Sequence, residues 1–301
     1  MQPTYSICVP NLNMGKQIGE ALRSVLSQID HNYEMVVVDD GSKDNSINIL
    51  EELKIEFTNL RTIYLPRDKR RNLAETRNIS VENAKGDYCI LHIDCDDIWE
   101  PYIQDFVKVF HALESIHVKP FLLSGQQINM GKRQFLLDNG PYKNGHMLED
   151  RDMWNRFYNL DALIFLDHVI FRTRMPLTLK QSLKKKFILP IRQMKDNIDK
   201  GQNWLFYCKN LWKKYTTQNL KYRVFLILIF PIAKIQKFLA RKSTENFESI
   251  LHFKQNIDHT GKTVTEIFNS LGREFDFSPL SQRGQLIFKF GSKERNFKDL
   301  T

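Results

Sequence analysis

One pattern occurs four times in the first hundred residues: a short apolar run, a polar turn, and a segment in which apolar residues return every three or four positions. The apolar runs begin at residues 5, 34, 60 and 88, so successive starts lie 29, 26 and 28 residues apart. This spacing is typical of a strand followed by a crossover helix, and near-continuous apolarity suits parallel strands that are covered on both faces. The sequence therefore predicts an α/β fold with a mostly parallel sheet flanked by helices.

The segments between the apolar runs have the spacing of amphipathic helices. Two of them carry apolar residues three and four positions apart: Ile18, Leu22, Val25, Leu26 and Ile29 in one, and Ile47, Leu50, Leu53 and Phe57 in the other. Right-handed crossovers bring the polar turns after the strands to one edge of the sheet, at the carboxyl ends of the strands, where ligands bind in open α/β folds. We therefore look for chemistry in those turns.

After residue 100 the pattern is less regular. It predicts a helix from about Pro101 to Glu114, strands at Val118–Ser124 and Phe135–Leu137, a helix that opens at Glu149, and a short strand at Leu286–Phe290. We expect three regions: an α/β domain over residues 1–178, a basic helical region over 179–242, and a small C-terminal extension over 243–301. The sequence of the extension suggests no chemistry.

Positive charge is concentrated in one part of the chain. The whole chain has 44 Lys and Arg against 35 Asp and Glu, a net charge of +9, but residues 180–242 alone hold 16 basic and two acidic residues, a charge of +14. Basic residues beside aromatic and aliphatic ones suit a helix on an anionic membrane surface. The same segment could instead pack against the α/β domain or bind nucleic acid. The apolar run Phe225–Phe230 has no place on a nucleic acid backbone, so we expect an anionic membrane surface as a partner and no nucleic acid.

Neither a secretory signal nor a membrane-spanning segment is predicted. The first residues lead directly into an apolar run of strand length, without the charged start and apolar stretch of a signal peptide. The longest apolar run, Val224–Ala233, has ten residues and contains Pro231, whereas a spanning helix needs about 20. Four cysteines without Cys-x-x-Cys spacing favour a reducing compartment. We expect a cytoplasmic protein that attaches peripherally to the inner face of the cell membrane.

Three carboxylates, Asp94, Asp96 and Asp97, follow the fourth apolar run. Two like charges 4 Å apart repel by about 4 kcal/mol at an effective dielectric constant near 20, so a compensating cation is expected. Because the available ligands are oxygens, the sequence predicts a hard divalent cation, Mn²⁺ or Mg²⁺. One of the acids could instead cap the helix that starts near Pro101, but a single cap does not explain three acids.

The other strand ends carry weaker signals. Asp39 and Asp40 follow the second run, where carboxylates can accept hydrogen bonds from a nucleobase or a ribose, although Asp-Gly-Ser is also ordinary turn chemistry. Pro10 and the asparagines near it end the first run and are common loop residues. Arg77 lies on a predicted helix just ahead of the acidic strand end, where it could bind a diphosphate or be a solvated arginine.

Together and in this order, these segments resemble family 2 of the glycosyltransferases, whose fold is called GT-A. The resemblance covers about residues 3–175 and is carried by Ser6–Asn13, Val37–Ser42, Ala74–Asn78, Gly86–Tyr88 and Asp94–Asp97. It implies a Rossmann-like catalytic domain over residues 1–178. It also implies inverting transfer of a sugar from a nucleotide diphosphate donor, here expected to be a UDP-sugar, to an acceptor hydroxyl with a divalent metal.

The resemblance also implies a role for each matching residue. The nucleotide-sugar would contact residues from all of the strand ends: Pro10 and Leu12 around the base, Asn13, Asp39 and Asp40 at the nucleoside, and Arg77, Asp94 and Asp96 at the ribose and diphosphate. The metal would be shared among Asp94, Asp96 and Asp97, without a decision on which of them contacts it directly.

A further match supplies a candidate catalytic residue. The family has an acidic pair followed by Leu-Trp-type residues, and Leu148–Arg156 has this form with Glu149 and Asp150 as the pair. The resemblance implies that Asp150 is the general base, because a carboxylate with a reference pKa of about 3.9 is ionised at pH 7 and can take the proton of the attacking hydroxyl. The alternative is that the two acids only favour a helix N-terminus.

One position departs from the family pattern. Members often have an aromatic strand that ends in Arg-x-His, and here Val169–Arg174 has Arg174 at the position of that histidine. Arg174 could bind phosphate directly, in which case the need for a metal would be weaker.

Several functions fit these observations. The expected role is in cell-surface polysaccharide or lipid-linked glycan synthesis, with a glycan or a lipid-linked molecule as the acceptor. If the acceptor is instead a polyprenyl phosphate, it is already an anion and Asp150 matters little. A catalytically inactive, membrane-bound scaffold with the same fold is the alternative from another class.

Overall fold

The computed structural model describes residues 2–125, 127–142, 149–176, 261–294 and 297. The chain divides into two compact units, and apart from residues 149–151 and 176 the described residues belong to the first of them. The predicted basic helical region, residues 179–242, lies outside the described part. In the part that is described, no helix combines the length and the apolarity needed to cross a bilayer.

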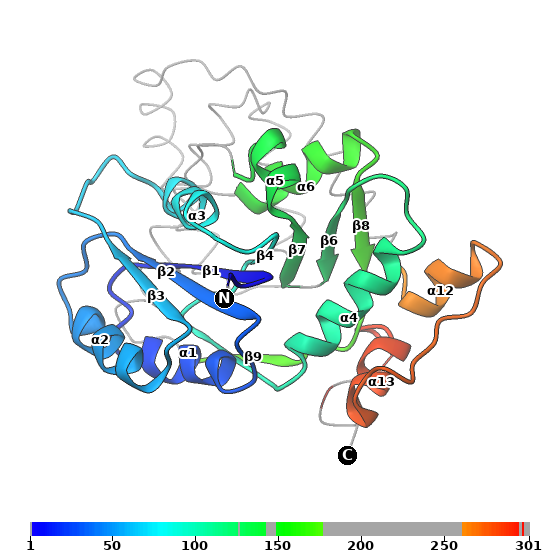
Figure 1. Cartoon of the computed structure of the whole chain (residues 1–301), viewed down its shortest axis with the longest axis horizontal. Coiled ribbons are helices and arrows are strands. Elements are labelled where there is room, and N and C mark those ends of the chain that lie inside the picture. The colour runs from blue at the N-terminus through cyan, green and yellow to red at the C-terminus, as the bar shows by residue number, and fades with distance from the viewer. Residues whose placement is uncertain (1, 126, 143–148, 177–260, 295–296, 298–301) are drawn as a thin grey trace, which may run out of the picture. The chain divides into compact units, whose positions relative to one another are not determined.

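A seven-stranded sheet forms the centre of the first unit (Figure 1). In spatial order its strands are β3 (Leu60–Tyr64), β2 (Tyr33–Asp39), β1 (Tyr5–Asn11), β4 (Tyr88–Leu91), β7 (Ile128–Lys132), β6 (Leu122–Gly125) and β8 (Leu163–Leu166). Neighbouring strands are parallel except at β7, which runs antiparallel to both β4 and β6. The predicted α/β fold with a mostly parallel sheet is confirmed, and the four apolar runs of the sequence are β1 to β4.

A separate two-stranded antiparallel sheet joins two segments that are far apart in the sequence. Its strands are β5 (Asp97–Trp99) and β9 (Arg172–Arg174). The register places Asp97 opposite Arg174 and Trp99 opposite Arg172. The acidic segment after β4 is thereby held against two arginines.

Helices lie on both faces of the sheet (Figure 1), and they build two apolar cores with it. The larger core includes α1 (Ile18–Leu26), α2 (Ser46–Glu56), α4 (Ile103–Glu114), α12 (Val264–Asn269) and α13 (Gln282–Lys289), and the smaller one includes α3 (Leu73–Glu82), α5 (Arg133–Asn139) and α6 (Glu149–Asn159). The predicted core faces of the first two helices are confirmed, because Ile18 and Leu22 of α1 and Leu50 and Leu53 of α2 are fully buried. The helices predicted near Pro101 and Glu149 are also confirmed, as α4 and α6.

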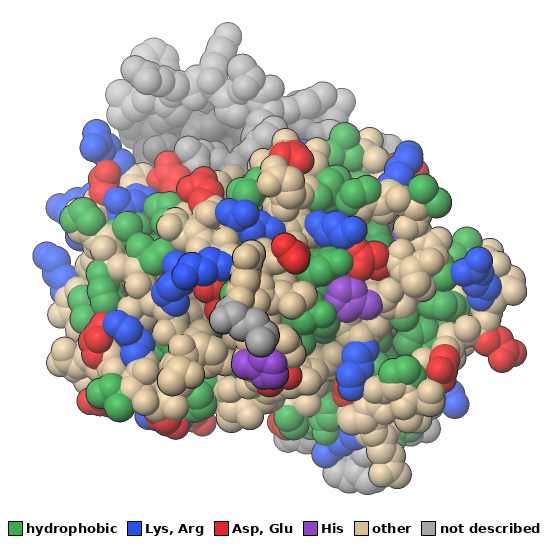
Figure 2. Space-filling model, in the orientation of Figure 1, with side chains coloured by type: hydrophobic (Ala, Val, Ile, Leu, Met, Phe, Trp, Pro, Cys, Tyr) green, Lys and Arg blue, Asp and Glu red, His purple; other side chains and the backbone are tan. Residues whose placement is uncertain are grey.

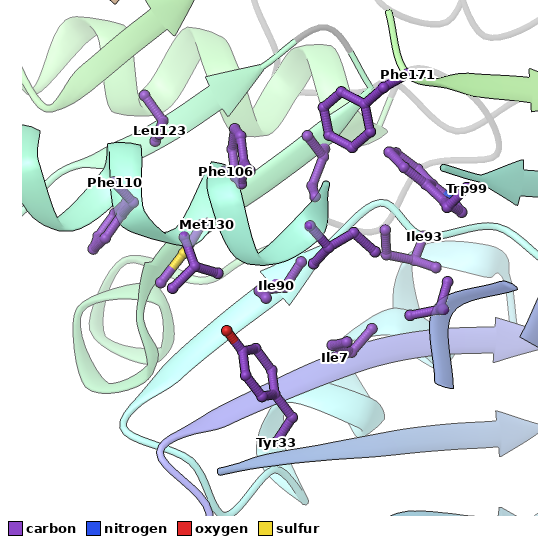
Figure 3. Close-up of a cluster of buried hydrophobic side chains, with 14 of the residues drawn as sticks. Ile7, Tyr33, Ile90, Ile93, Trp99, Phe106, Phe110, Leu123, Met130 and Phe171 are labelled. Atoms are coloured by element: carbon purple, nitrogen blue, oxygen red, sulfur yellow. The ribbon is translucent and has the colours of Figure 1, made fainter. Parts of the chain in front are cut away.

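The larger core supports the strand ends that carry the acids. Ile7 and Ile90, on the neighbouring strands β1 and β4, lie in one cluster with Phe106 of α4 (Figure 3). Phe171 meets Trp99 edge to face, with ring centroids 5.6 Å apart. Buried aromatic packing therefore fixes the chain just after Asp97 and just before Arg172.

Three strand predictions for the second half of the chain are wrong in position or type. Phe135–Leu137 belongs to α5, and all but the last residue of Leu286–Phe290 belongs to α13. A short apolar run does not by itself distinguish a strand from a helix, and the side chain of Ser281 caps the start of α13. The strand predicted at Val118–Ser124 begins only at Leu122.

The described part of the predicted C-terminal extension, residues 261–294, packs against the α/β domain. Asp105 on α4 accepts hydrogen bonds from the backbone N–H and the hydroxyl of Ser281, at 3.1 and 2.5 Å. Asp167, which follows β8, accepts one from the backbone N–H of Ser292 at 3.0 Å. These contacts join the segment to α4 and to the loop between β8 and β9, which leads to Arg172 and Arg174.

Truncation of Phe288 is expected to destabilise the fold. Phe288 is fully buried, and its ring centroid lies 6.4 Å from that of Phe106, 5.3 Å from His168 and 6.1 Å from Phe171. Because the substitution leaves a cavity, Phe288→Ala should lower the free energy of unfolding by about 3 kcal/mol, measured by urea denaturation. Leu271→Ala, at an exposed position, is the control and should change it little. A loss below 1 kcal/mol in Phe288→Ala would show that the extension is not part of the core.

Candidate active site

A cleft of about 310 Å³ lies at the carboxyl edge of the sheet, around the ends of β1 and β4, the turn after β2 and the start of α3. Several of the predicted nucleotide-binding residues line it: Pro10, Leu12, Asp40, Arg77, Asp94 and Asp96. A larger and more open depression of about 720 Å³ lies at the opposite edge, near Tyr33 and Lys85, and none of the described residues predicted for the site lines it. The candidate site is therefore the cleft at the carboxyl edge, which brings together five segments that are separated in the sequence.

Two other residues predicted to bind the nucleotide, Asp39 and Asn13, lie next to the cleft without lining it. Asp39 is fully buried and accepts hydrogen bonds from the Asn11 amide at 2.6 Å and from the N–H and hydroxyl of Ser42 at 2.8 and 2.6 Å. Asn13 donates its backbone N–H to the Ser42 hydroxyl at 2.8 Å and accepts from the Lys43 N–H at 2.8 Å. In the structure both residues brace the turn after β2 against the end of β1.

Asp40 lines the cleft with its carboxylate bound by two arginines. Arg67 donates to one oxygen at 2.5 Å and Arg71 donates to the other. The neighbouring Gly41 has a φ of 71°, and a Cβ there would lie 2.6 Å from the backbone nitrogen of Arg67, so only glycine allows this close approach. Sequence reasoning missed Arg67 and Arg71, although the charged run at residues 67–71 after the third strand was a signal.

Arg77 faces the acids from the helix that was predicted to carry it. A capping box between Asn72 and Glu75 starts α3. Arg77, on the buried side of this helix, donates from Nη2 to Asp94 at 3.0 Å, and its guanidinium lies 5.3 Å from the centre of the Tyr142 ring. Arg77 is 4% exposed, so this ion pair is shielded from water.

The three predicted acids form one cluster. Asp94, Asp96 and Asp97 each contribute a carboxylate oxygen, and these oxygens all lie within 4.8 Å of one another. Two arginines from β9 contact them. Arg172 donates to Asp97 at 2.6 Å, and Arg174 donates to both oxygens of Asp97 at 3.0 and 3.2 Å and to Asp94 at 3.2 Å. The positive charge expected beside the acids is thus supplied in part by arginines.

The donor set fits a hard divalent cation on one side of this cluster. Asp97 is 1% exposed and is bound by two arginines, so its carboxylate is engaged and buried. Asp96 differs, because Arg174 is 3.8 Å from its carboxylate and, among the described residues, no arginine lies within hydrogen-bond distance of it. Asp96 and Asp94 also line the cleft. They are therefore the acids that a cation could reach from the cleft.

Burial and neighbouring charges shift the pKa values of Asp96 and Arg174. Burial is the largest cause that raises the pKa of Asp96 above its ordinary value; Arg174 lowers it, and the charges of Asp94 and Asp97 raise it. Hydrogen bonds to Asp97 raise the pKa of Arg174, which keeps the guanidinium charged. The ionised form of Asp96 is thus disfavoured by burial and by the charges of Asp94 and Asp97.

The helix that carries Asp150 is held firmly by its later turns. Asp150 lies in the first turn of α6, where the sequence predicted it. Met153 and Phe157 of α6 are fully buried in the smaller core. Arg156 donates to the carbonyls of Asn139 and Gly140, both at 2.6 Å, and so ties α6 to the end of α5. The role of Asp150 as a base stays a prediction.

Comparison with known proteins gives a family. The family model described as glycosyl transferase family 2 matches residues 6–171. The glycosyltransferase GlyG of Streptococcus pneumoniae serotype 4 is 33% identical over 98 residues, which is 33% of this chain and 32% of that protein. The Escherichia coli protein WfgD, a UDP-Glc:alpha-D-GlcNAc-diphosphoundecaprenol beta-1,3-glucosyltransferase, is 35% identical over 95 residues, or 31% of this chain and 35% of that one.

Among solved structures, residues 1–349 of TarS from S. aureus in complex with UDP are similar to this chain, with a TM-score of 0.45 and 19% identity over 53% of this chain and 56% of that one. The chain spans about a third of the length of the curated relatives that it matches. The family model, by contrast, matches more than half of the chain and contains the ends of β1, β2 and β4 around the cleft. The protein therefore belongs to glycosyl transferase family 2.

Proposed function

We propose that this protein transfers a sugar from a UDP-sugar to an acceptor hydroxyl, with inversion, in the synthesis of a cell-surface polysaccharide or a lipid-linked glycan. The observation that carries the proposal is the cleft at the carboxyl edge of the sheet, where Asp94 and Asp96 lie beside Asp40 and Arg77 within the region that matches the family. A cleft of about 310 Å³ is at the lower end of the range for small-molecule sites.

The lining of the cleft supports a nucleoside diphosphate donor. Pro10 and Leu12 give it an apolar wall for a base, and Asp40 and Arg71 give it polar groups that can read the edge of that base. Arg77 supplies a cation for a phosphate. WfgD, which matches this chain over 95 residues, uses UDP-glucose according to its name, and this favours uridine as the nucleoside.

Asp96, with Asp94, is the proposed ligand set for a divalent cation, Mn²⁺ or Mg²⁺. Both carboxylates line the cleft, and the oxygen-only donor set suits a hard cation. When bound, such a cation stabilises the negative charge that develops on the departing diphosphate. Asp97 would hold Arg172 and Arg174 in place beside it.

Asp150 is the proposed general base. The support is its place in the family motif and in the first turn of a helix whose later turns are rigidly packed. A base on the face of the sugar opposite the diphosphate takes the proton of the acceptor hydroxyl while the bond to the diphosphate breaks, which gives a single displacement with inversion.

A thermal-shift panel tests the donor class. UDP, GDP, dTDP and CMP are each added with and without Mn²⁺, and UDP with Mn²⁺ should give the largest rise in Tm. At 100 times its Kd a ligand adds about 2.7 kcal/mol of stability, which corresponds to a rise of about 5 °C in a chain of this size. Asp276→Asn, which changes an exposed acid far from the cleft in sequence, is the control and should keep the full response. The absence of any shift with all four nucleotides would contradict the proposed function.

From the sequence alone we also propose that residues 179–242 attach the protein to an anionic membrane surface. On the face shown in Figure 2, Lys and Arg side chains are interspersed with Asp and Glu. Residues 180–242 carry a charge of +14, more than the +9 of the whole chain, and this basic excess is the feature that would favour anionic lipid.

We expect the protein to sediment with vesicles that contain anionic lipid and to be released by salt, because screening weakens the attraction between the basic segment and the headgroups. Replacement of Lys184, Lys185 and Lys186 by glutamine should weaken binding to these vesicles. Equal recovery on neutral and anionic vesicles would contradict the electrostatic part of the proposal.

A further inference from the structure

Arg174 occupies a special place at the edge of the cleft. It stands opposite Asp97 in the β5–β9 pair, and the backbone N–H of Met175 donates to the carbonyl of Asp96 at 2.8 Å, which fixes the chain just after it. Its Nε and Nη2 atoms bind the two oxygens of Asp97 at 3.0 and 3.2 Å, and Nη2 also binds Asp94 at 3.2 Å. Two of the three guanidinium nitrogens, Nε and Nη2, are therefore held by the carboxylates of Asp97 and Asp94.

The remaining nitrogen of this guanidinium is available to a ligand. Among the described residues, none accepts a hydrogen bond from Nη1 of Arg174, whose side chain is 39% exposed and lines the cleft. Arg172 differs, because its side chain is 14% exposed, contacts Asp97 and does not line the cleft. Arg172 thus binds Asp97 and does not reach the cleft lining, whereas Arg174 lines the cleft and its Nη1 is bound by none of the described residues.

The charges around the acids balance without an added cation. Asp94, Asp96 and Asp97 carry three negative charges, and the arginines in contact with them, Arg77, Arg172 and Arg174, carry three positive ones. Three unbalanced carboxylates would repel a diphosphate until a cation neutralised them. With Arg174 in place the described cluster is neutral and still offers the donors of one guanidinium.

We propose that Arg174 is a diphosphate-binding residue that shares the donor's phosphates with the metal, so that nucleotide binding persists when the metal is removed. This inference rests on the proposed function, because it assumes that a nucleoside diphosphate binds in the cleft. Nη1 carries two N–H groups, and a charged guanidinium makes strong hydrogen bonds to phosphate oxygens. Asp97 acts as the anchor that keeps the guanidinium pointed at the phosphates.

The test is calorimetric titration of the full chain with UDP, once in Mn²⁺ and once in EDTA. The wild-type protein should bind UDP in both, more tightly in Mn²⁺. Arg174→Ala should weaken binding in EDTA by about tenfold to a hundredfold, the range for a charged hydrogen bond, and weaken it less in Mn²⁺. Arg174→Lys keeps the charge but loses the planar guanidinium, so its affinity for UDP should lie between those of the wild type and of Arg174→Ala. Arg23→Ala, which removes an arginine from an exposed ion pair with Glu56, should bind like the wild type.

The outcomes separate the two proposals. Binding of UDP by the wild type in Mn²⁺ but not in EDTA would overturn the inference and leave the proposed function standing. Equal weakening in both conditions by Arg174→Ala, with Arg174→Lys like the wild type, would show that Arg174 only neutralises the acids, and this would also overturn it. The absence of UDP binding in both conditions would overturn the proposed donor, and the inference with it.

Discussion

We expect Asp96→Asn to lose most sugar transfer while the protein stays folded. Asp96 lines the cleft and, among the described residues, has no arginine within hydrogen-bond distance, so it is the acid best placed to hold a cation. If that cation provides several kcal/mol of stabilisation to the departing diphosphate, its loss should reduce kcat/KM by about 10² to 10⁴-fold, measured with UDP-sugar and acceptor at saturating Mn²⁺.

Although Asp96→Asn should lose activity, it should not destabilise the fold. The pKa of Asp96 in the folded protein is raised, mainly by burial, so its ionised form disfavours the fold at pH values above that raised pKa. This cost disappears as the pH falls toward the ordinary pKa of 3.8. Asp96→Asn removes the charge, so in EDTA at pH 7 its Tm should equal or exceed that of the wild type, and the difference should shrink as the solution is acidified.

Asp97→Asn is the contrasting variant. Asp97 is buried and holds both Arg172 and Arg174, and removal of one partner from a buried ion pair costs about 3–5 kcal/mol. We therefore expect Asp97→Asn to lower the free energy of unfolding and Asp96→Asn not to lower it. If both variants were equally unstable, the assignment of Asp96 as a metal ligand and of Asp97 as the residue that holds the arginines would be wrong.

The second large effect is expected at Asp150. If its carboxylate removes the proton of an acceptor hydroxyl, Asp150→Asn should reduce kcat by about 10² to 10⁴-fold with little change in the affinity for UDP. The measurement is steady-state transfer at saturating donor, together with UDP titration. Asp161→Asn is a matched control: Asp161 is exposed and has a φ of 54°, a conformation that asparagine also tolerates.

The result at Asp150 also discriminates between acceptors. A phosphate acceptor is already an anion and needs no base, so retention of full turnover in Asp150→Asn would favour transfer to a polyprenyl phosphate and contradict the proposed hydroxyl acceptor. A collapse of turnover with unchanged UDP affinity would also exclude the inactive scaffold.

The first half of the fold could be predicted because local pattern and topology agree there. β1 to β4 are buried runs separated by crossover helices, and parallel pairing then places their carboxyl ends at one edge. The second half lacks this regularity. β7 runs antiparallel, and its five residues alternate, with apolar side chains only at Ile128 and Met130. It therefore lacks the continuous apolar run that marks the strands of the first half.

The candidate site was predictable where its members are close in the sequence. Asp94, Asp96 and Asp97 lie within four residues and had to share a space. The position of Arg174 on these acids depends on the β5–β9 register between residues 77 positions apart, which local pattern does not specify. The buried position of Asp39 likewise involves a hydrogen bond from Asn11, which lies 28 residues earlier in the chain.

The central claim is that Asp96 joins a divalent cation to a nucleoside diphosphate in the cleft. The most direct measurement is the affinity for UDP of the wild type and of Asp96→Asn, with and without Mn²⁺. We predict that Mn²⁺ tightens binding of UDP to the wild type and has little effect in Asp96→Asn. An equal gain from Mn²⁺ in both proteins would contradict the claim, because the cation would then be held elsewhere.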